Sequence, residues 1–89
     1  MKAKVQNMTS SNGNEVANQF EIRTDEGLFF QSYNSVIVFI PKSGKTQLDE
    51  RFWDYSKTTG KYRTQFLGET KKETEQKIAS GEYVLANLN

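Results

Sequence analysis

The pattern of apolar and polar residues predicts four β-strands before the chain changes character near residue 55. Residues 17–24 alternate apolar with polar side chains, as a strand with one buried face does, and residues 28–32 continue after a turn at Gly27. Residues 35–40 form an unbroken apolar run rich in β-branched side chains, which is typical of a strand buried on both faces. Residues 46–55 predict a fourth strand that ends in aromatic side chains.

Helix signals then replace strand signals. Ser56 or Thr58 can accept a hydrogen bond from the first turn of a helix, and that helix is expected to end near Gly68. Thr70 and Glu73 have the spacing of a capping box, in which two side chains bond two backbone N–H groups at a helix start. The sequence therefore predicts two consecutive short helices.

The order of elements defines a fold class. Gly81 ends the second helix, and residues 83–88 return as a last strand, which gives the order β-β-β-β-α-α-β. We predict an α+β fold with a small, mostly antiparallel sheet and two short helices packed on one face. Residues 1–16 are polar, and we expect a loose arm there, with a short hairpin as the alternative. Residues 17–89 are expected to form a single α+β domain.

The acidic residues around the second helix have structural explanations. Glu69 and Glu73 lie at its N-terminus, where carboxylates complete the cap and stabilise the helix dipole. Lys71 with Glu75, and Glu73 with Lys77, are spaced four residues apart, so that opposite charges attract on one helix face. No carboxylate carries a sign of burial in the sequence, and none is assigned to acid–base or metal-ion chemistry.

Composition excludes several classes of function. The 89 residues contain no histidine, which removes the usual general base and the commonest metal ligand, and no cysteine, which removes thiolate chemistry and disulfides. The net charge of +1 is not that of a polybasic nucleic-acid binder. We therefore predict a cytoplasmic protein that is not an enzyme and uses no cofactor or metal.

The segment 52–63 contains the best candidates for a contact surface. Its aromatic side chains are interleaved with cations and hydroxyl groups, a composition that suits a protein interface or the stacking of nucleic-acid bases. In the alternative interpretation the aromatic residues are core and the cations are solvated. One tyrosine of an earlier strand joins this set, and the candidate binding residues are Tyr33, Trp53, Tyr55, Lys57, Lys61 and Arg63.

The same segments resemble a known family. Residues 31–38 (QSYNSVIV), Gly44, residues 53–62 (WDYSKTTGKY) and residues 66–67 together are similar to a family of small, uncharacterised bacteriophage and prophage proteins. The resemblance extends over roughly residues 16–88. It implies an origin in a phage or another mobile element, and it supplies no mechanism and no site residues.

Together these observations favour a protein that acts by stoichiometric binding. The expected partner is a host or phage protein in the bacterial cytoplasm, and inhibition of bacterial defence, as anti-CRISPR proteins do, is one form of such binding. The first alternative is a weak nucleic-acid binder that uses cations beside the aromatic residues, namely Lys57, Lys61, Arg63, Lys71 and Lys72. A sponge for a small anionic ligand is the second. The sequence leaves monomer and homodimer open.

Overall fold

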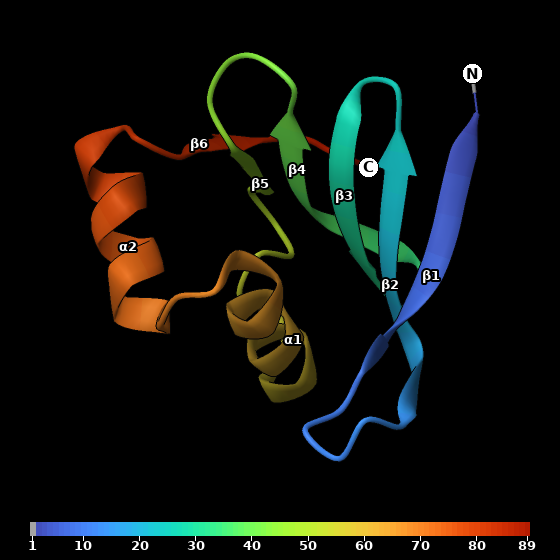
Figure 1. Cartoon of the computed structure of the whole chain (residues 1–89). Helices are drawn as coiled ribbons and strands as arrows, with labels where there is room; N and C mark the ends of the chain where they lie inside the picture. Colours follow the sequence, from blue (N-terminus) through green and yellow to red (C-terminus); the bar gives the residue numbers. More distant parts are fainter. Residues whose placement is uncertain (1) are drawn as a thin grey trace.

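The computed structural model describes residues 2–89, which form a six-stranded sheet and two helices (Figure 1). The strands follow the chain across the sheet in the order β1-β2-β3-β4-β5-β6, and all neighbours are antiparallel except β5 and β6. The predicted α+β class with a mostly antiparallel sheet is confirmed. The elements are β1 (Ala3–Thr9), β2 (Glu15–Thr24), β3 (Gly27–Ser32), β4 (Ser35–Pro41), β5 (Gln47–Asp49), α1 (Lys57–Leu67), α2 (Lys71–Ser80) and β6 (Val84–Ala86).

The N-terminal residues form a strand of the sheet. β1 runs antiparallel to β2, with Val5 opposite Ile22, and β2 already begins at Glu15. The loose arm expected over residues 1–16 is therefore wrong for the described part; these residues do enter a hairpin, but its second strand is β2, which extends to Thr24. Met1 lies outside the described residues. β1 is one of the two edge strands and is largely exposed, so its sequence lacks the apolar alternation that marks a half-buried strand.

A bulge in the β3–β4 pair explains the unbroken apolar run of β4. Phe30 pairs with Val38 and Gln31 pairs with Val36, so that Ile37 is the extra residue between them. Ile37 and Val38 both belong to the buried core, whereas Val36 is only half-buried. The expectation that this strand is buried on both faces is wrong, because the bulge directs two successive side chains to the same face.

A buried carboxylate ends β5 earlier than the sequence predicts. Only Gln47–Asp49 pair as a strand, so the strand predicted over residues 46–55 is wrong beyond Asp49. The carboxylate of Asp49 accepts backbone N–H bonds from Arg51 (3.0 Å) and Phe52 (2.9 Å), and a third from the segment after β6. Burial on its own raises the pKa of Asp49, but these hydrogen bonds outweigh it and hold the pKa below its usual value.

The helix ends are formed by the residues that the sequence indicates. Ser56 is the N-cap of α1 and accepts the backbone N–H of Thr59, while Gly68 ends the helix at a φ of 71°. The capping box of α2 is complete, with Thr70 and Glu73 each bonded to the backbone of the other. These local signals position both helices between β5 and β6.

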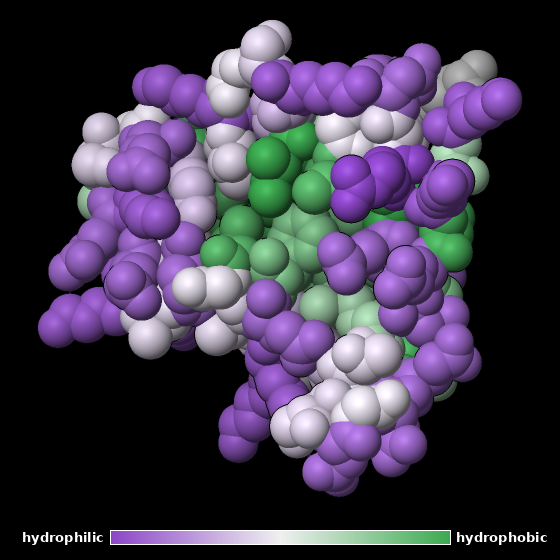
Figure 2. All heavy atoms as spheres, in the orientation of Figure 1, coloured by the Kyte–Doolittle hydropathy of each residue, from purple (hydrophilic) through white to green (hydrophobic). Residues whose placement is uncertain are grey.

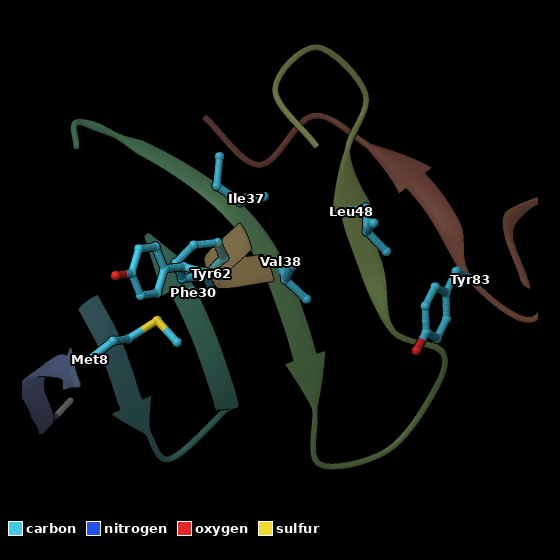
Figure 3. Packing of buried hydrophobic residues seen from close by; sticks show 7 residues of the cluster. All are labelled: Met8, Phe30, Ile37, Val38, Leu48, Tyr62 and Tyr83. Carbon is cyan, nitrogen blue, oxygen red and sulfur yellow. The ribbon is translucent and has the colours of Figure 1, made fainter. Parts of the chain in front are cut away.

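The core lies between the helices and one face of the sheet. Figure 3 shows side chains from β1, β3, β4, β5 and α1, together with Tyr83, converging on this layer. In Figure 2 hydrophobic side chains gather over the middle of the sheet, above α1, and hydrophilic side chains surround them. The buried apolar residues are Met8, Phe30, Ile37, Val38, Leu48, Tyr62 and Tyr83.

A second buried carboxylate, Glu69, bonds both α2 and Tyr83, the residue that precedes β6. It accepts hydrogen bonds from Thr74 Oγ1 (2.6 Å), the Tyr83 hydroxyl (2.5 Å) and Lys77 Nζ (3.0 Å). Burial raises the pKa of Glu69, but these bonds outweigh it and the pKa lies below its usual value. No pattern in the sequence marks this burial, and Glu69 is more than a helix-dipole partner.

Candidate functional site

Tyr33 stands in a backbone conformation that side chains of its size rarely adopt. It follows Ser32 in the two-residue loop between β3 and β4, and its φ is 55°. The first position of such a loop usually takes glycine or asparagine when φ is positive, and a bulky residue there costs about 1–3 kcal/mol. The Tyr33 N–H donates to the carbonyl of Asn18 (2.7 Å), which also has a positive φ of 66°. This pairing fixes the loop and holds the tyrosine in place.

Tyr33 and Tyr55 lie on the same cleft, which has a volume of about 550 Å³. Tyr33 is 49% exposed and Tyr55, in the turn before α1, is 66% exposed. Below them Ser32 Oγ and Thr59 Oγ1 are hydrogen-bonded at 2.9 Å. No lining residue is charged, and the cleft therefore combines aromatic rings with hydroxyl and amide groups. The lining residues are Ser32, Tyr33, Asn34, Ser35, Ile37, Phe52, Tyr55, Ser56, Thr58 and Thr59.

A basic groove lies on the other side of Ser56, along α1. Lys57 and Lys61 line it and are exposed, and Lys71 from the start of α2 completes it. Lys71 Nζ lies 2.8 Å from a carboxylate oxygen of Asp54, an ion pair that lowers the pKa of Asp54 and raises that of Lys71. Within residues 2–89 the ion pairs expected inside α2 are absent, because its lysines bond carboxylates outside the helix.

Arg63 also lines the basic groove, but its side chain is almost completely buried. Its side chain is 1% exposed, its guanidinium lies 5.1 Å from the centre of the Trp53 ring, and it donates to the Trp53 carbonyl. It also lies 3.4 Å from Asp54 Oδ1. Trp53 is half-buried against the core. Trp53 therefore has the structural role that the alternative interpretation gave the aromatic residues, whereas Arg63 is not the solvated cation of that interpretation.

Comparison with family models gives one match, over residues 3–81, to a family of unknown function, DUF8033. The chain belongs to the DUF8033 family. The match covers both tyrosines of the cleft and every lysine of the basic groove, and it includes the β1–β2 hairpin. Comparison with curated proteins and with solved structures gives no significant match.

Several residues of the DUF8033 cleft were missed in the sequence. Ser32 and Thr59 form its polar floor, yet a serine in a strand and a threonine in a helix have no special signal before the fold brings them together. Gln19 is paired in register with Ser32 and is fully buried, and its side-chain amide has no hydrogen-bond partner among residues 2–89. A signal for Tyr33 was available, because only two residues separate the strands predicted over residues 28–32 and 35–40, and two-residue turns commonly require a positive φ.

Two further observations concern the described part of this DUF8033 protein. Neither helix within residues 2–89 has the length and apolar character that crossing a membrane requires. The acidic side chains of the same residues form no group of three or more that is placed to hold a metal ion.

Proposed function

We propose that this DUF8033 protein acts by stoichiometric binding to a protein partner, and that the cleft between Tyr33 and Tyr55 is its contact site. The observation that carries the proposal is Tyr33, whose ring is half-exposed at the cleft although its backbone is strained. Strain of this kind persists where the surrounding structure enforces it, and it concentrates at binding sites. A glycine or asparagine at this position would relieve the backbone strain. The strain is therefore the cost of placing a tyrosine ring at the cleft.

The chemistry of the cleft indicates what the partner presents. Tyrosine gives a large apolar contact and a hydroxyl at small entropic cost, and it is enriched among the residues that dominate interface energies. The uncharged lining favours an apolar or neutral polar side chain, inserted between the rings with its polar end toward Ser32 and Thr59. A charged group would lose its hydration there without finding an opposite charge.

The nature of the partner follows from the resemblance to phage proteins. A small phage protein with no catalytic residues acts most simply by occupying a host or phage protein in the bacterial cytoplasm. Inhibition of a defence protein, as by an anti-CRISPR protein, is the biological form of this proposal. The enzyme hypothesis has no supporting group in the cleft, whose lining contains no carboxylate, histidine, cysteine or lysine.

Nucleic-acid binding is the second candidate, because the basic groove adjoins the cleft. Ser56 lines both, so a strand stacked on Tyr55 would place its phosphates near Lys57 and Lys61. This candidate predicts an affinity that falls steeply with salt concentration. The charge reversal Lys57→Glu with Lys61→Glu should abolish such binding and leave the fold intact, because both side chains are exposed.

The test is capture of partners from a bacterial host lysate by the tagged protein, with and without nuclease. We expect a near-stoichiometric protein that resists nuclease and is lost from Tyr55→Ala. Leu85→Ala is the control, because Leu85 is an exposed apolar residue outside the cleft. Partners lost with nuclease would support the second candidate. Equal capture by Tyr55→Ala and Leu85→Ala would refute the assignment of the cleft.

A further inference from the structure

Over β1, β2 and β3 the two faces of the sheet differ in charge, and the uncovered face is the uncharged one. In the regular part of the β1–β2–β3 ladder, Lys4, Glu21 and Arg23 share one face because Lys4 pairs with Arg23 and side chains alternate along each strand. This is also the face of Phe30, which belongs to the core under the helices. All three charged side chains of this ladder therefore project on the helix side.

The opposite face carries an apolar row. Val5 pairs with Ile22, Ile22 with Phe29, and Phe29 with Phe39, which places the four side chains in one row across four strands. The rings of Phe29 and Phe39 are stacked with centres 4.4 Å apart. The row continues through the neutral Gln47 to Val84. None of these residues packs against the core cluster, and none is fully buried.

No element of residues 2–89 covers this row. Both helices pack on the core side, and in Figure 1 β1 and β2 extend away from them. A half-exposed row of valine, isoleucine and phenylalanine on a strand face is the pattern of a sheet that packs on another sheet. The side chains of Ile22, Phe29 and Phe39 are half-buried and that of Val5 is exposed, so a second layer would bury further apolar surface.

We propose that this face is the interface of a homodimer, with the same face of a second copy packed on it. A two-fold interface brings each patch against itself, which a charged patch resists and an uncharged one allows. Six strands spaced about 4.8 Å apart and about six residues long give a face of roughly 24 by 20 Å. Two such faces bury about 1,000 Å², without counting the extra area of the side chains that project from them. This is about the area that a specific interface requires.

The proposal is independent of the cleft, which lies on the helix side of the sheet beside Ser32 and Thr59. It also differs from pairing through the open edge of β1, which would leave the row uncovered. A second copy therefore supplies what the fold itself does not, a cover for the row of Val5, Ile22, Phe29 and Phe39.

The experiment is a mass measurement in solution by sedimentation equilibrium, over a concentration series. We expect the wild type to have twice the chain mass at micromolar concentration, and Ile22→Lys to have the mass of one chain with an unchanged far-ultraviolet circular dichroism spectrum. Gln6→Lys is the matched control, because it adds the same single positive charge on the opposite face, beside Val5, and it should remain dimeric. Tyr55→Ala should also remain dimeric while losing its captured partner.

Val5→Lys gives a second test that folding cannot confound, since Val5 is already 62% exposed. It should weaken the dimer at least tenfold in dissociation constant. Interfaces of this size normally persist at about 100 µM. A wild type that is monomeric at that concentration therefore overturns the proposal. It does so even if another protein or a lipid vesicle is then found to bind this face. A dimer unaffected by both Val5→Lys and a folded Ile22→Lys also overturns it, and points to the edge of β1.

Discussion

The replacement Glu69→Gln should destabilise the protein by about 2–3 kcal/mol. Glu69 accepts two buried hydroxyl hydrogen bonds, from Thr74 and Tyr83. A hydrogen bond to an ionised group contributes about 1.5–3 kcal/mol and a neutral one about 0.5–1.5, so the loss of charge costs about 1 kcal/mol for each bond. One hydroxyl must also turn to meet the amide NH₂ that replaces an acceptor oxygen. The third partner, Lys77, is partly exposed, and water screens its attraction.

The assay is urea unfolding at pH 7, supported by thermal melts. A loss of about 2 kcal/mol should lower the melting temperature by roughly 8–16 °C in a domain of this size. Glu75→Gln, on the exposed side of the same helix, is the control and should change stability by less than about 0.5 kcal/mol.

The pH dependence gives the sign of the effect. Because the folded pKa of Glu69 lies below its usual value of 4.5, its contribution is complete above pH 4.5 and is lost as the pH falls through the folded pKa. The gap between wild type and Glu69→Gln should therefore close in acid. A stability within about 0.5 kcal/mol of wild type at pH 7, or a gap that persists at pH 2, would refute this reasoning.

Three other substitutions have defined outcomes. Arg63→Lys should cost about 2–3 kcal/mol in urea unfolding, because lysine cannot reproduce the planar stack on Trp53 and the fork of donors; an unchanged midpoint would return Arg63 to the surface. Gly27→Ala should cost at least about 3 kcal/mol or prevent folding, since a Cβ there would lie 2.1 Å from the carbonyl oxygen of Ile40; soluble, wild-type-like protein would contradict this. Tyr33→Asn should stabilise the fold by about 0.5–1 kcal/mol and abolish partner capture, whereas a destabilised protein would show that the ring supports the fold.

The sequence predicted those elements whose signals are local. The boundaries of both helices follow from Ser56, Thr70 and the two terminal glycines, because capping depends on side chains within a few residues of the backbone groups they bond. The β2–β3 hairpin is equally local. The N-terminal strand was missed because an exposed edge strand needs no apolar alternation, so β1 looks like a polar arm until its partner is known.

The errors in the candidate site arose from long-range contacts. Asp49 ends β5 through a local turn, in which its carboxylate accepts the N–H groups of Arg51 and Phe52. Its bond to Leu88, however, comes from the far end of the chain, and no local pattern indicates it. Arg63 was placed on the surface because arginine is almost never fully buried without partners, and its partners come from the preceding turn. The cleft formed by Tyr33 and Tyr55 needs the β3–β4 loop and the start of α1 to meet, which only the fold provides.

The parallel pairing of β5 with β6 sets an order in which the chain can fold. Hairpins between successive strands from β1 to β4 close short loops, whereas β6 can pair with β5 only after both helices have folded back across the sheet. We therefore expect the meander and α1 to be structured in the folding transition state and β6 to dock last. Asp49, whose carboxylate holds the segment after β6, reports on this step. Asp49→Asn should accelerate unfolding in stopped-flow experiments and leave the folding rate nearly unchanged, whereas slower folding would place β6 in the nucleus. Release of the C-terminal strand would then set the unfolding rate, and with it the lifetime of the folded state.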